Sequence, residues 1–288
     1  MSDVLTHTDT AKLYGSAEAL PVIMTNTGQF RCVIALQGAQ ILEFSSKGQD
    51  FLWLSPNAKF EAGKPVRGGI PICAPWFGVH PEDPGKIKHG FVRNALWTLE
   101  GAELDEENER AAVRLSFAHQ ADDLFAHGFR MDYVITLSER LTLEMTITNT
   151  GAEAMPFSWA FHSYHPVSSL AAARVAGLGG GRYLDATDGF KPKMQAGMID
   201  FPGEVDRGYE DVPETQTLIP SPSLSISAEN CPSCIVWNPG AELAKGMADV
   251  GEEAYRGFVC VERGAVRNNA LSIAGGESVT GRLVIGAG

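Results

Sequence analysis

The sequence predicts an all-β protein with one large antiparallel β-sandwich domain over residues 1–288. Glycine (31) and proline (16) account for 47 of the 288 residues, and they separate short apolar segments at fairly even spacing. This pattern is typical of many antiparallel strands joined by turns. Residues 141–149 alternate between apolar and polar side chains, which indicates a strand with one buried face. No repeat, linker or low-complexity segment interrupts the chain, and we therefore expect a single domain.

The expected strands follow one another along the whole chain. Turns at Gly38 and at residues 48–50 separate hairpin-like units in the N-terminal part, and residues 138–140 form the turn of a further hairpin. A helix is expected only within 241–250, and the acidic residues 103–110 are expected to form a solvated turn. We predict strands at 22–24, 30–36, 40–44, 51–54, 96–100, 111–117, 131–137, 141–149, 157–161, 173–176, 224–227, 234–237, 257–261, 270–273 and 279–285.

The charge and the N-terminal composition exclude several classes of partner. The formal net charge is −12, which argues against nucleic acid or an anionic membrane as a main partner. Residues 1–10 lack the basic and then apolar pattern of a signal peptide. No apolar run approaches the roughly 18 residues that a membrane-spanning helix requires. We therefore expect a cytoplasmic protein that binds neither nucleic acid nor a membrane.

The cysteines point to the same compartment. Their number is five, an odd count in a long chain, which does not suit a disulfide framework. Cys231 and Cys234 have the CxxC spacing of a redox motif or of half a zinc site. However, no second CxxC or paired histidines follow, and no βαβ pattern surrounds the motif. We interpret these residues as reduced thiols near the start of a strand, in keeping with the cytoplasm.

Residues 67–97 form an unusually constrained segment between predicted strands. The segment contains five glycines and four prolines, with Arg67 at one end and Arg93 near the other. Glycine lets the backbone approach a ligand closely, whereas proline fixes φ. Because a long ordered loop is costly to form, we interpret this one as a binding loop across one face of the sandwich. The two arginines indicate an anionic ligand, and our working hypothesis is that this ligand is an anionic sugar.

The histidines offer two candidates for chemistry. His89 lies at the end of the loop, where it either caps the loop or faces a ligand. His162 follows a predicted strand, and His165 comes three residues later. Strand alternation would place His162 and Tyr164 on one face, with Phe161 on the other. No HExxH motif or cysteine cluster completes a metal site near this pair, so we expect no metal.

Two carboxylates are distinguished by their positions. Glu262 directly follows the predicted strand 257–261 and precedes Arg263 at an expected turn. It either faces a pocket with a perturbed pKa or lies on the surface. Asp185 follows the glycine-rich residues 177–181, which lack the strand–helix context and the GK[ST] motif of a phosphate-binding loop. We interpret those glycines as turn residues.

Seven segments of the sequence resemble one known family, and they occur in the family's order. They are RGGIPICAPWFG, HGFVRNALW, AFHSYH, GLGGGRYLD, VWNPG, KGMADVG and FVCVERG. The chain is thereby similar to the glucose-6-phosphate 1-epimerase (hexose-6-phosphate mutarotase) group of the aldose 1-epimerase superfamily. The first two segments form a specific signature, and the matches cover nearly the whole chain. The resemblance implies a galactose mutarotase-like supersandwich and a cofactor-free isomerase that interconverts the α and β anomers of a hexose 6-phosphate, glucose 6-phosphate above all.

The same resemblance implies roles for individual residues. His162 resembles the catalytic histidine, and Glu262 resembles the catalytic carboxylate. Arg67 and Arg93 match the arginines that bind the phosphate, and His89 matches the loop histidine near the sugar ring. Asp185 matches the acid that binds sugar hydroxyls, with Asp188 as the alternative. In this reading Glu262 is the base on O1 and His162 the acid toward the ring oxygen O5.

This sequence departs from the family pattern at two positions. Lys88 stands where relatives often have glutamine or a small residue, which bears on contact with the ligand. His165 stands where an aromatic residue is commoner, and we expect this change to be peripheral. Trp76, Phe77 and Trp237 are candidates for stacking on the sugar face or for core packing, with neither role favoured.

Two alternative functions follow from the same residues. One is a mutarotase for unphosphorylated aldoses. The pairing of Arg67 with Arg93 argues against it, because the binding of a neutral sugar does not require two guanidinium groups. The other is a non-catalytic phosphosugar-binding protein, since a fold does not fix a function; the presence of both His162 and Glu262 favours an enzyme. We expect a small-molecule phosphosugar as the partner and a monomer or a weak homo-oligomer.

Overall fold

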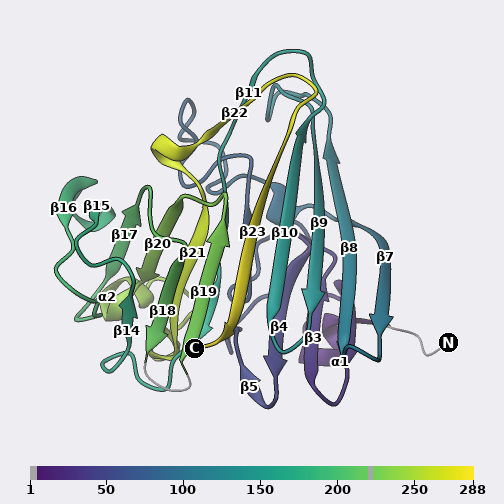
Figure 1. The fold of residues 1–288 in the computed structure, drawn as a ribbon, viewed down its shortest axis with the longest axis horizontal. Coiled ribbons are helices and arrows are strands. Elements are labelled where there is room, and N and C mark those ends of the chain that lie inside the picture. Colours follow the sequence, from purple (N-terminus) through teal and green to yellow (C-terminus); the bar gives the residue numbers. More distant parts are fainter. Residues whose placement is uncertain (1–4, 220–222) are drawn as a thin grey trace.

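The computed structural model describes residues 5–219 and 223–288, and it confirms the predicted all-β fold class (Figure 1). The named strands form three large sheets and a two-stranded ribbon, and they pair with one another in antiparallel fashion. Residues 1–4 of the expected domain and residues 220–222 lie outside the described part of the chain. Among the helices of the described part, none has the length and apolar content that a membrane crossing requires.

The first sheet, which we call the N-terminal sheet, has the strand order β1-β2-β3-β4-β5. Its strands are β1 (Thr6–Asp9), β2 (Pro21–Asn26), β3 (Phe30–Ala35), β4 (Gln40–Ser46) and β5 (Gln49–Asp50). A small ribbon elsewhere pairs β11 (Met155–Phe157) with β22 (Leu271–Ile273).

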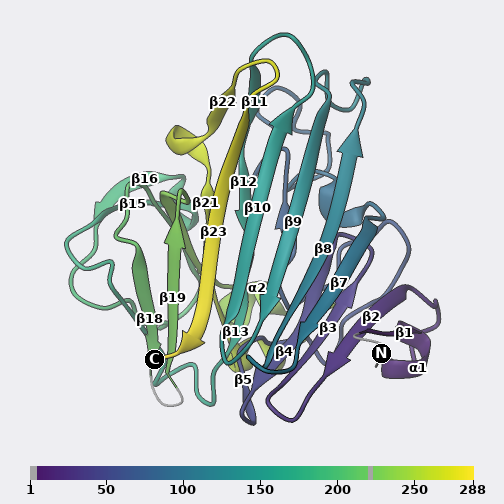
Figure 2. The ribbon, with the colours of Figure 1, turned by 45° about the vertical axis from the view of Figure 1, so that its right-hand side comes forward.

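The second sheet, which we call the front sheet, is the one nearest the viewer in Figure 1. Its order is β14-β18-β19-β23-β10-β9-β8-β7. Its strands are β14 (Arg174–Ala176), β18 (Thr215–Ile219), β19 (Leu224–Glu229), β23 (Ser278–Ala287), β10 (Leu141–Asn149), β9 (Phe129–Leu137), β8 (Arg110–His119) and β7 (Thr98–Asp105). Figure 2 shows the N-terminal sheet behind and below the β7–β8 edge.

The third sheet, which we call the cleft sheet, has the order β16-β15-β17-β20-β21-β12-β6, and β13 also pairs with β21. Its strands are β16 (Lys191–Met194), β15 (Arg182–Asp185), β17 (Val205–Tyr209), β20 (Ser233–Asn238), β21 (Phe258–Ala265), β12 (Trp159–Phe161), β6 (Ile72–Cys73) and β13 (Tyr164–Pro166). The short β6 lies within the loop of residues 67–97, so this loop is tied to the sheet that it crosses.

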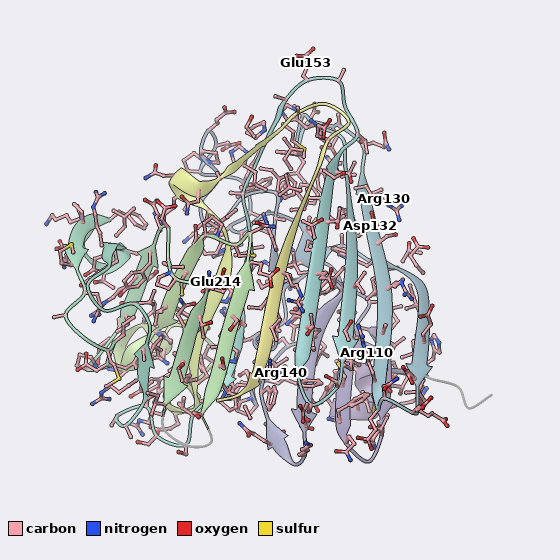
Figure 3. The ribbon with its side chains drawn as sticks, viewed as in Figure 1. Arg110, Arg130, Asp132, Arg140, Glu153 and Glu214 are labelled. Atoms are coloured by element: carbon pink, nitrogen blue, oxygen red, sulfur yellow. The ribbon has the colours of Figure 1, made fainter. Side chains whose placement is uncertain are left out.

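The main core is shared by the front sheet, the N-terminal sheet and the cleft sheet. The predicted alternation of β10 is confirmed, because its apolar side chains are fully buried: Leu141, Leu143, Met145 and Ile147. The opposite face of the front sheet is polar, and Figure 3 labels several charged side chains there, among them Arg110, Arg130, Asp132 and Arg140. A sheet that covers a core on one face and meets water on the other gives this period of two.

Helices are few and short. They are α1 (Thr10–Tyr14), α2 (Gly240–Ala244) and the 3₁₀ turns η1 (Val92–Asn94), η2 (Ala186–Asp188), η3 (Ala254–Gly257) and η4 (Arg267–Asn269). The helix expected within 241–250 is therefore a single turn. The expectation of no other helix was wrong at α1, where Asp9 accepts a hydrogen bond from the Lys12 amide at 2.9 Å and Gly15 ends the helix in the left-handed conformation. These are ordinary helix caps.

Several predicted strand boundaries were wrong. Residues 51–54 form no named strand, although the Trp53 amide donates to the Tyr164 carbonyl at 3.0 Å. The acidic segment 103–110 is only partly a turn, because β7 extends to Asp105. The prediction also missed strands that are very short or rich in polar residues, namely β1, β5, β6, β13, β15, β16, β17 and β18. Tertiary pairing overrides weak local propensity in such strands.

The strand that carries Glu262 is longer than predicted. β21 continues to Ala265, so Glu262 lies inside a fully buried strand and the turn expected at Arg263 is absent. Gly264 misled the prediction, because it is a glycine of close packing and not of a turn. A Cβ at Gly264 would lie 2.1 Å from the Trp159 carbonyl oxygen on the neighbouring β12.

Candidate active site

A cleft of about 660 Å³ lies on the face of the cleft sheet that points away from the core, a size typical of small-molecule sites. The loop of residues 67–97 forms one wall, and the sheet forms the floor. The lining residues include Arg67, Phe77, Lys88, His89 and Arg93 from the loop, His162 and Tyr164 after β12, and Asp206, Trp237 and Glu262 from three strands. Thus five of the six site residues predicted from the sequence line one cleft.

Strand register explains which side chains reach the cleft. Directly paired residues of neighbouring strands point to the same face of a sheet. The register aligns Asp206 with Trp237, Trp237 with Cys260 and Cys260 with Tyr164 in one row across the sheet. A second row aligns Ile235 with Glu262 on the same face. The core face carries the residues between them.

His162 and Glu262 form a close pair at the cleft floor. The Nε2 atom of His162 lies 3.4 Å from the Oε1 atom of Glu262, and both side chains are buried. The His162 ring stacks on Tyr164 with centroids 4.9 Å apart, which confirms that these two residues share a face. Two further atoms, His162 Nδ1 and Glu262 Oε2, are buried without a hydrogen-bond partner within the described residues.

Burial pushes the two groups toward their neutral forms. Desolvation raises the pKa of Glu262 well above its usual value, and the nearby Asp206 adds to this, while Arg93 opposes it. Desolvation lowers the pKa of His162 well below its usual value, with further contributions from His89, Arg93 and Arg67. Burial therefore favours the neutral carboxyl group and the neutral imidazole.

Arg67 is fixed in the cleft wall on two sides. Its Nε donates to Asp249 Oδ2 at 3.0 Å, and its Nη1 donates to the Tyr164 hydroxyl at 2.9 Å. Burial lowers the pKa of Arg67, but Tyr164 and Asp249 more than offset this, so its pKa lies above the usual value. Arg67 is thus a permanently charged and oriented group in the cleft lining.

The other end of the loop places a second cationic group and a histidine in the cleft. Arg93 Nη2 donates to the Lys88 carbonyl oxygen at 2.9 Å, and its buried Nε has no partner in the described chain. His89 caps the loop, because its Nδ1 accepts from the Gly78 amide at 3.3 Å, and it also lines the cleft. Burial lowers the pKa of His89 to about 3, with help from Arg93, so the ring is neutral.

Asp185 does not reach the cleft, and neither does Asp188. Asp185 pairs with Arg207 across β15 and β17, which places it on the face opposite Asp206. Its Oδ1 accepts from the Thr187 hydroxyl at 2.6 Å, and its Oδ2 lies 2.8 Å from Lys193 Nζ. The carboxylate therefore caps η2 and forms an ion pair.

Asp206 is the acidic residue that sequence reasoning missed. It lines the cleft from β17, and burial raises its pKa to about 6, against the opposing charge of Arg267. Arg267 also lines the cleft, and its buried Nε has no partner within the described residues. The available signal was a charged pair, Asp206-Arg207, between the apolar Val205 and Tyr209, but the strand itself had not been predicted.

The aromatic candidates separate into two groups. Trp237 and Phe77 line the cleft, and Trp237 lies edge-on to His162 with centroids 6.0 Å apart. Trp76 is buried outside the cleft, where its Nε1 donates to the Ile87 carbonyl oxygen at 2.9 Å. His165 is also away from the cleft, since its ring nitrogens contact Phe51 O and Ser163 Oγ.

Comparison with known proteins assigns the chain to a family. The model of the family described as aldose 1-epimerase matches residues 21–286. The chain belongs to the aldose 1-epimerase family. Two relatives bear the name "Putative glucose-6-phosphate 1-epimerase": one from Cenchrus ciliaris, 34% identical over 88% of this chain and 80% of its own length, and one from Escherichia coli K12, 30% identical over 85% and 83%.

Solved structures of similar proteins confirm the predicted mutarotase-like fold. A crystal structure from Salmonella typhimurium, described as that of a "putative mutarotase", matches with a TM-score of 0.86 and 26% identity, and covers 98% of this chain and 93% of that chain. A galactose mutarotase-like protein from Clostridium acetobutylicum matches with a TM-score of 0.72 at 16% identity, over 93% and 96%. The second match shows the fold alone.

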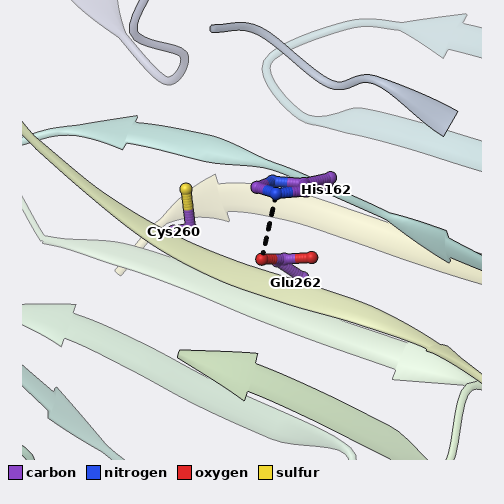
Figure 4. A group of neighbouring side chains, drawn as sticks. All are labelled: His162, Cys260 and Glu262. Atoms are coloured by element: carbon purple, nitrogen blue, oxygen red, sulfur yellow. Dashed lines mark ion pairs between the residues drawn. The ribbon is translucent and has the colours of Figure 1, made fainter. Parts of the chain in front are cut away.

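A buried sulfur atom lies close to the His162–Glu262 pair. Cys260 precedes Glu262 by two residues on β21, and the candidate ligand atoms of His162, Cys260 and Glu262 all lie within 4.8 Å of one another. Figure 4 shows the three side chains on the same side of the strand, with the His162–Glu262 pair dashed. All five cysteines are free and buried, as predicted for reduced thiols.

Proposed function

We propose that this protein interconverts the α and β anomers of a hexose 6-phosphate, with glucose 6-phosphate as the preferred substrate. One observation carries the proposal: a buried histidine–carboxylate pair, His162 and Glu262, lies on the floor of a cleft that Arg67 and Arg93 also line. The names of the relatives from Cenchrus ciliaris and Escherichia coli support the same substrate.

Anomer exchange requires one group that accepts a proton and another that donates one. In our proposal Glu262 takes the proton from the O1 hydroxyl while His162 protonates O5, and the C1–O5 bond breaks to give the open-chain aldehyde. C1 then rotates about the C1–C2 bond. The reverse transfers close the ring on the other face, so no net proton is gained or lost.

The resting protonation of the pair fits this cycle. A neutral glutamic acid beside a neutral histidine carries the same proton count as a carboxylate beside an imidazolium. Transfer of that proton across the 3.4 Å between Glu262 and His162 converts the resting pair into the reactive pair. In the bound state the O1 hydroxyl would donate to the Glu262 carboxylate and O5 would accept from the His162 imidazolium, and hydrogen bonds to the charged forms favour those forms.

The phosphate is assigned to the loop side of the cleft. Arg67 and Arg93 are the expected phosphate ligands, with Lys88 as an additional cation at the rim. We assign hydroxyl binding to Asp206, because Asp185 lies on the opposite face of the sheet. His89 presents Nε2–H, since its Nδ1 accepts from Gly78, and we propose that it contacts the sugar ring. Trp237 and Phe77 cover the apolar ring face.

The decisive experiment is anomer exchange by saturation-transfer NMR, with glucose 6-phosphate and glucose side by side. We expect accelerated exchange for the phosphate alone. Equal acceleration of both sugars would contradict the phosphate assignment and favour a mutarotase for free aldoses. Acceleration of neither, together with binding of glucose 6-phosphate, would favour the non-catalytic binding protein. A cytoplasmic location and a monomer or weak homo-oligomer stay predictions.

A further inference from the structure

The sulfur atom beside the candidate catalytic pair has no role in the proposed reaction. Cys260 is fully buried, and the register places it in the row between Trp237 and Tyr164, on the face that carries Glu262. Together with His162 and Glu262 it presents one sulfur, one nitrogen and one oxygen donor to the same small volume (Figure 4). Such a mixed donor set is typical of zinc and rare for magnesium or calcium.

We propose that His162, Cys260 and Glu262 form a binding site for a thiophilic divalent cation such as Zn²⁺, and that occupation of this site blocks the cleft. The cation would be an exchangeable inhibitor. It would take the Nε2 atom of His162 and a carboxylate oxygen of Glu262, the two groups that the proposed reaction needs. The metal and the sugar would therefore exclude each other.

The geometry suits a tetrahedral ion. Zinc binds nitrogen and oxygen at about 2.1 Å and sulfur at about 2.3 Å, so the ligand atoms of a tetrahedral site lie about 3.4–3.7 Å apart. The His162 Nε2 to Glu262 Oε1 distance is already 3.4 Å. The widest separation in the cluster is at most 4.8 Å, and a side-chain rotation that closes it by about 1 Å completes the set.

The charges of the ligands and the unsatisfied carboxylate oxygen of Glu262 also support binding of a divalent cation. A thiolate and a carboxylate together neutralise a divalent cation, which offsets the repulsion from Arg67 and Arg93 in the cleft wall. Glu262 Oε2 is buried without a hydrogen-bond partner within the described residues, so it is available as a donor. Three protein ligands leave the fourth position toward the cleft, which His162 and Glu262 line, for a water molecule.

One feature of His162 distinguishes this site from one built for a permanent metal. A histidine that holds a resident zinc ion commonly donates its other ring N–H to a carboxylate or a backbone carbonyl oxygen of the protein. His162 Nδ1 has no such partner within the described chain. Binding of the metal is therefore reversible and competitive with the substrate.

The test combines inhibition with direct detection of the metal. Anomer exchange on glucose 6-phosphate is measured against increasing zinc chloride, then after addition of EDTA, and with magnesium chloride as the comparison. We expect inhibition by Zn²⁺, recovery with EDTA and no inhibition by Mg²⁺ at the same concentration. Cys260→Ala should retain zinc-free exchange and require at least about tenfold more Zn²⁺ for half inhibition.

The matched control is Cys234→Ala, which removes another fully buried thiol, one that belongs to the CxxC motif. We expect this variant to be inhibited like the wild type. Equal zinc sensitivity of Cys260→Ala and the wild type would overturn the proposal, as would loss of inhibition in Cys234→Ala, which would place the metal at the CxxC motif.

A spectroscopic measurement tests the metal site without turnover, so its outcome is independent of the test of the proposed function. Co²⁺ bound through Cys260 should give a sulfur-to-cobalt charge-transfer band in the near ultraviolet, and glucose 6-phosphate should displace it. The wild type alone is sufficient for this arm if Cys260→Ala fails to fold. Absence of the band, or a band that glucose 6-phosphate leaves unchanged, would refute the site even if the epimerase activity is confirmed.

Discussion

Two adjacent buried residues of β21, Glu262 and Arg263, show how differently one strand treats ionisable groups on its two faces. Arg263 points to the core, where its guanidinium donates to the carbonyl oxygens of Ser233 (3.2 Å), Glu214 (2.8 Å) and Cys231 (2.8 Å). It also donates to the side chain of Gln216 on β18 at 2.5 Å, and so links the cleft sheet to the front sheet. Glu262 points to the cleft, where Oε1 lies 3.4 Å from His162 Nε2 and Oε2 has no hydrogen-bond partner among the described residues.

The difference teaches how to separate a structural from a functional buried charge. A buried polar group without a partner costs stability, and most folded proteins avoid it. Of the nine such atoms in the described residues, four belong to side chains that line the cleft, on Arg93, His162, Glu262 and Arg267. A ligand with hydroxyl and phosphate groups would satisfy them, whereas Arg263 needs nothing from outside.

The largest effect is expected from loss of the carboxylate. Glu262→Gln should reduce enzymatic anomer exchange by at least about a hundredfold, because the proposed base is removed. The thermal midpoint should stay the same or rise, since an unpartnered buried carboxyl group costs stability. Saturation-transfer NMR and thermal unfolding measure the two quantities. Unchanged exchange would remove Glu262 from the mechanism.

The opposite outcome is expected one residue further on. Arg263→Met should lower the free energy of unfolding by about 3 kcal/mol, because it leaves several buried carbonyl oxygens without donors. Urea unfolding measures this loss. Arg282→Ala, which removes an exposed pair with Glu229, is the control and should cost about 0.5 kcal/mol or less. A stable Arg263→Met protein would mean that the core face also tolerates unsatisfied groups.

The phosphate assignment predicts a selective loss of affinity. Arg93→Met should raise the KM for glucose 6-phosphate by about tenfold or more, because one charge-assisted hydrogen bond is lost. Any residual activity on glucose should not change. Lys64→Met is the matched control, since Lys64 is exposed and pairs with Glu61 outside the cleft. Equal losses for both sugars would place Arg93 in a structural role.

The assignment of hydroxyl binding to Asp206 predicts that kcat/KM depends on pH. Its pKa in the fold is about 6 because of burial, so kcat/KM should fall as the pH drops through 6 and the carboxylate can no longer accept two hydroxyl hydrogen bonds. A sugar phosphate titrates near the same pH, and the measure is therefore the difference between the wild type and Asp206→Asn, whose profile should be flatter. Identical profile shapes would exclude Asp206 as the titrating group.

Protonation of Asp206 should raise the stability of the fold, although it should lower kcat/KM. The folded pKa of Asp206 lies above its ordinary value of 3.8, so the folded state binds this proton more tightly than the unfolded state. The penalty for burying the charge is present above pH 6 and disappears as the pH falls toward 4. Asp206→Asn should thus gain stability relative to the wild type at neutral pH, as measured by urea unfolding.

The smallest effect is expected at the residue that the sequence favoured. Asp185→Asn should change kcat/KM by less than about twofold, because its side chain lies on the face opposite the cleft and pairs with Lys193. Asp206→Asn serves as the comparison in the same assay. A larger effect of Asp185→Asn than of Asp206→Asn would reverse our assignment of the hydroxyl-binding carboxylate.

Much of the fold follows from local sequence. The alternation of residues 141–149 identifies β10 with its bounds, and the hairpin with β9 follows from the turn at 138–140. The signature segments around Arg67 and Arg93 identify the family and the loop that walls the cleft. His162 and Glu262 lie in the short segments AFHSYH and FVCVERG, and the resemblance of these segments to the family identifies both residues. Local pattern is enough where each residue's role depends on its immediate neighbours in the chain.

Only the tertiary structure decided which acid enters the cleft, why Gly264 is a glycine and which thiol lies beside the pair. Asp185 and Asp206 are 21 residues apart and sit on neighbouring strands, yet they face opposite sides of the sheet. The physical reason is that side chains alternate with a period of two, so a shift of one residue in strand pairing exchanges the two faces. The sequence by itself determined the strands, the family and the chemical groups. The pairing between distant strands decided which of those groups meet.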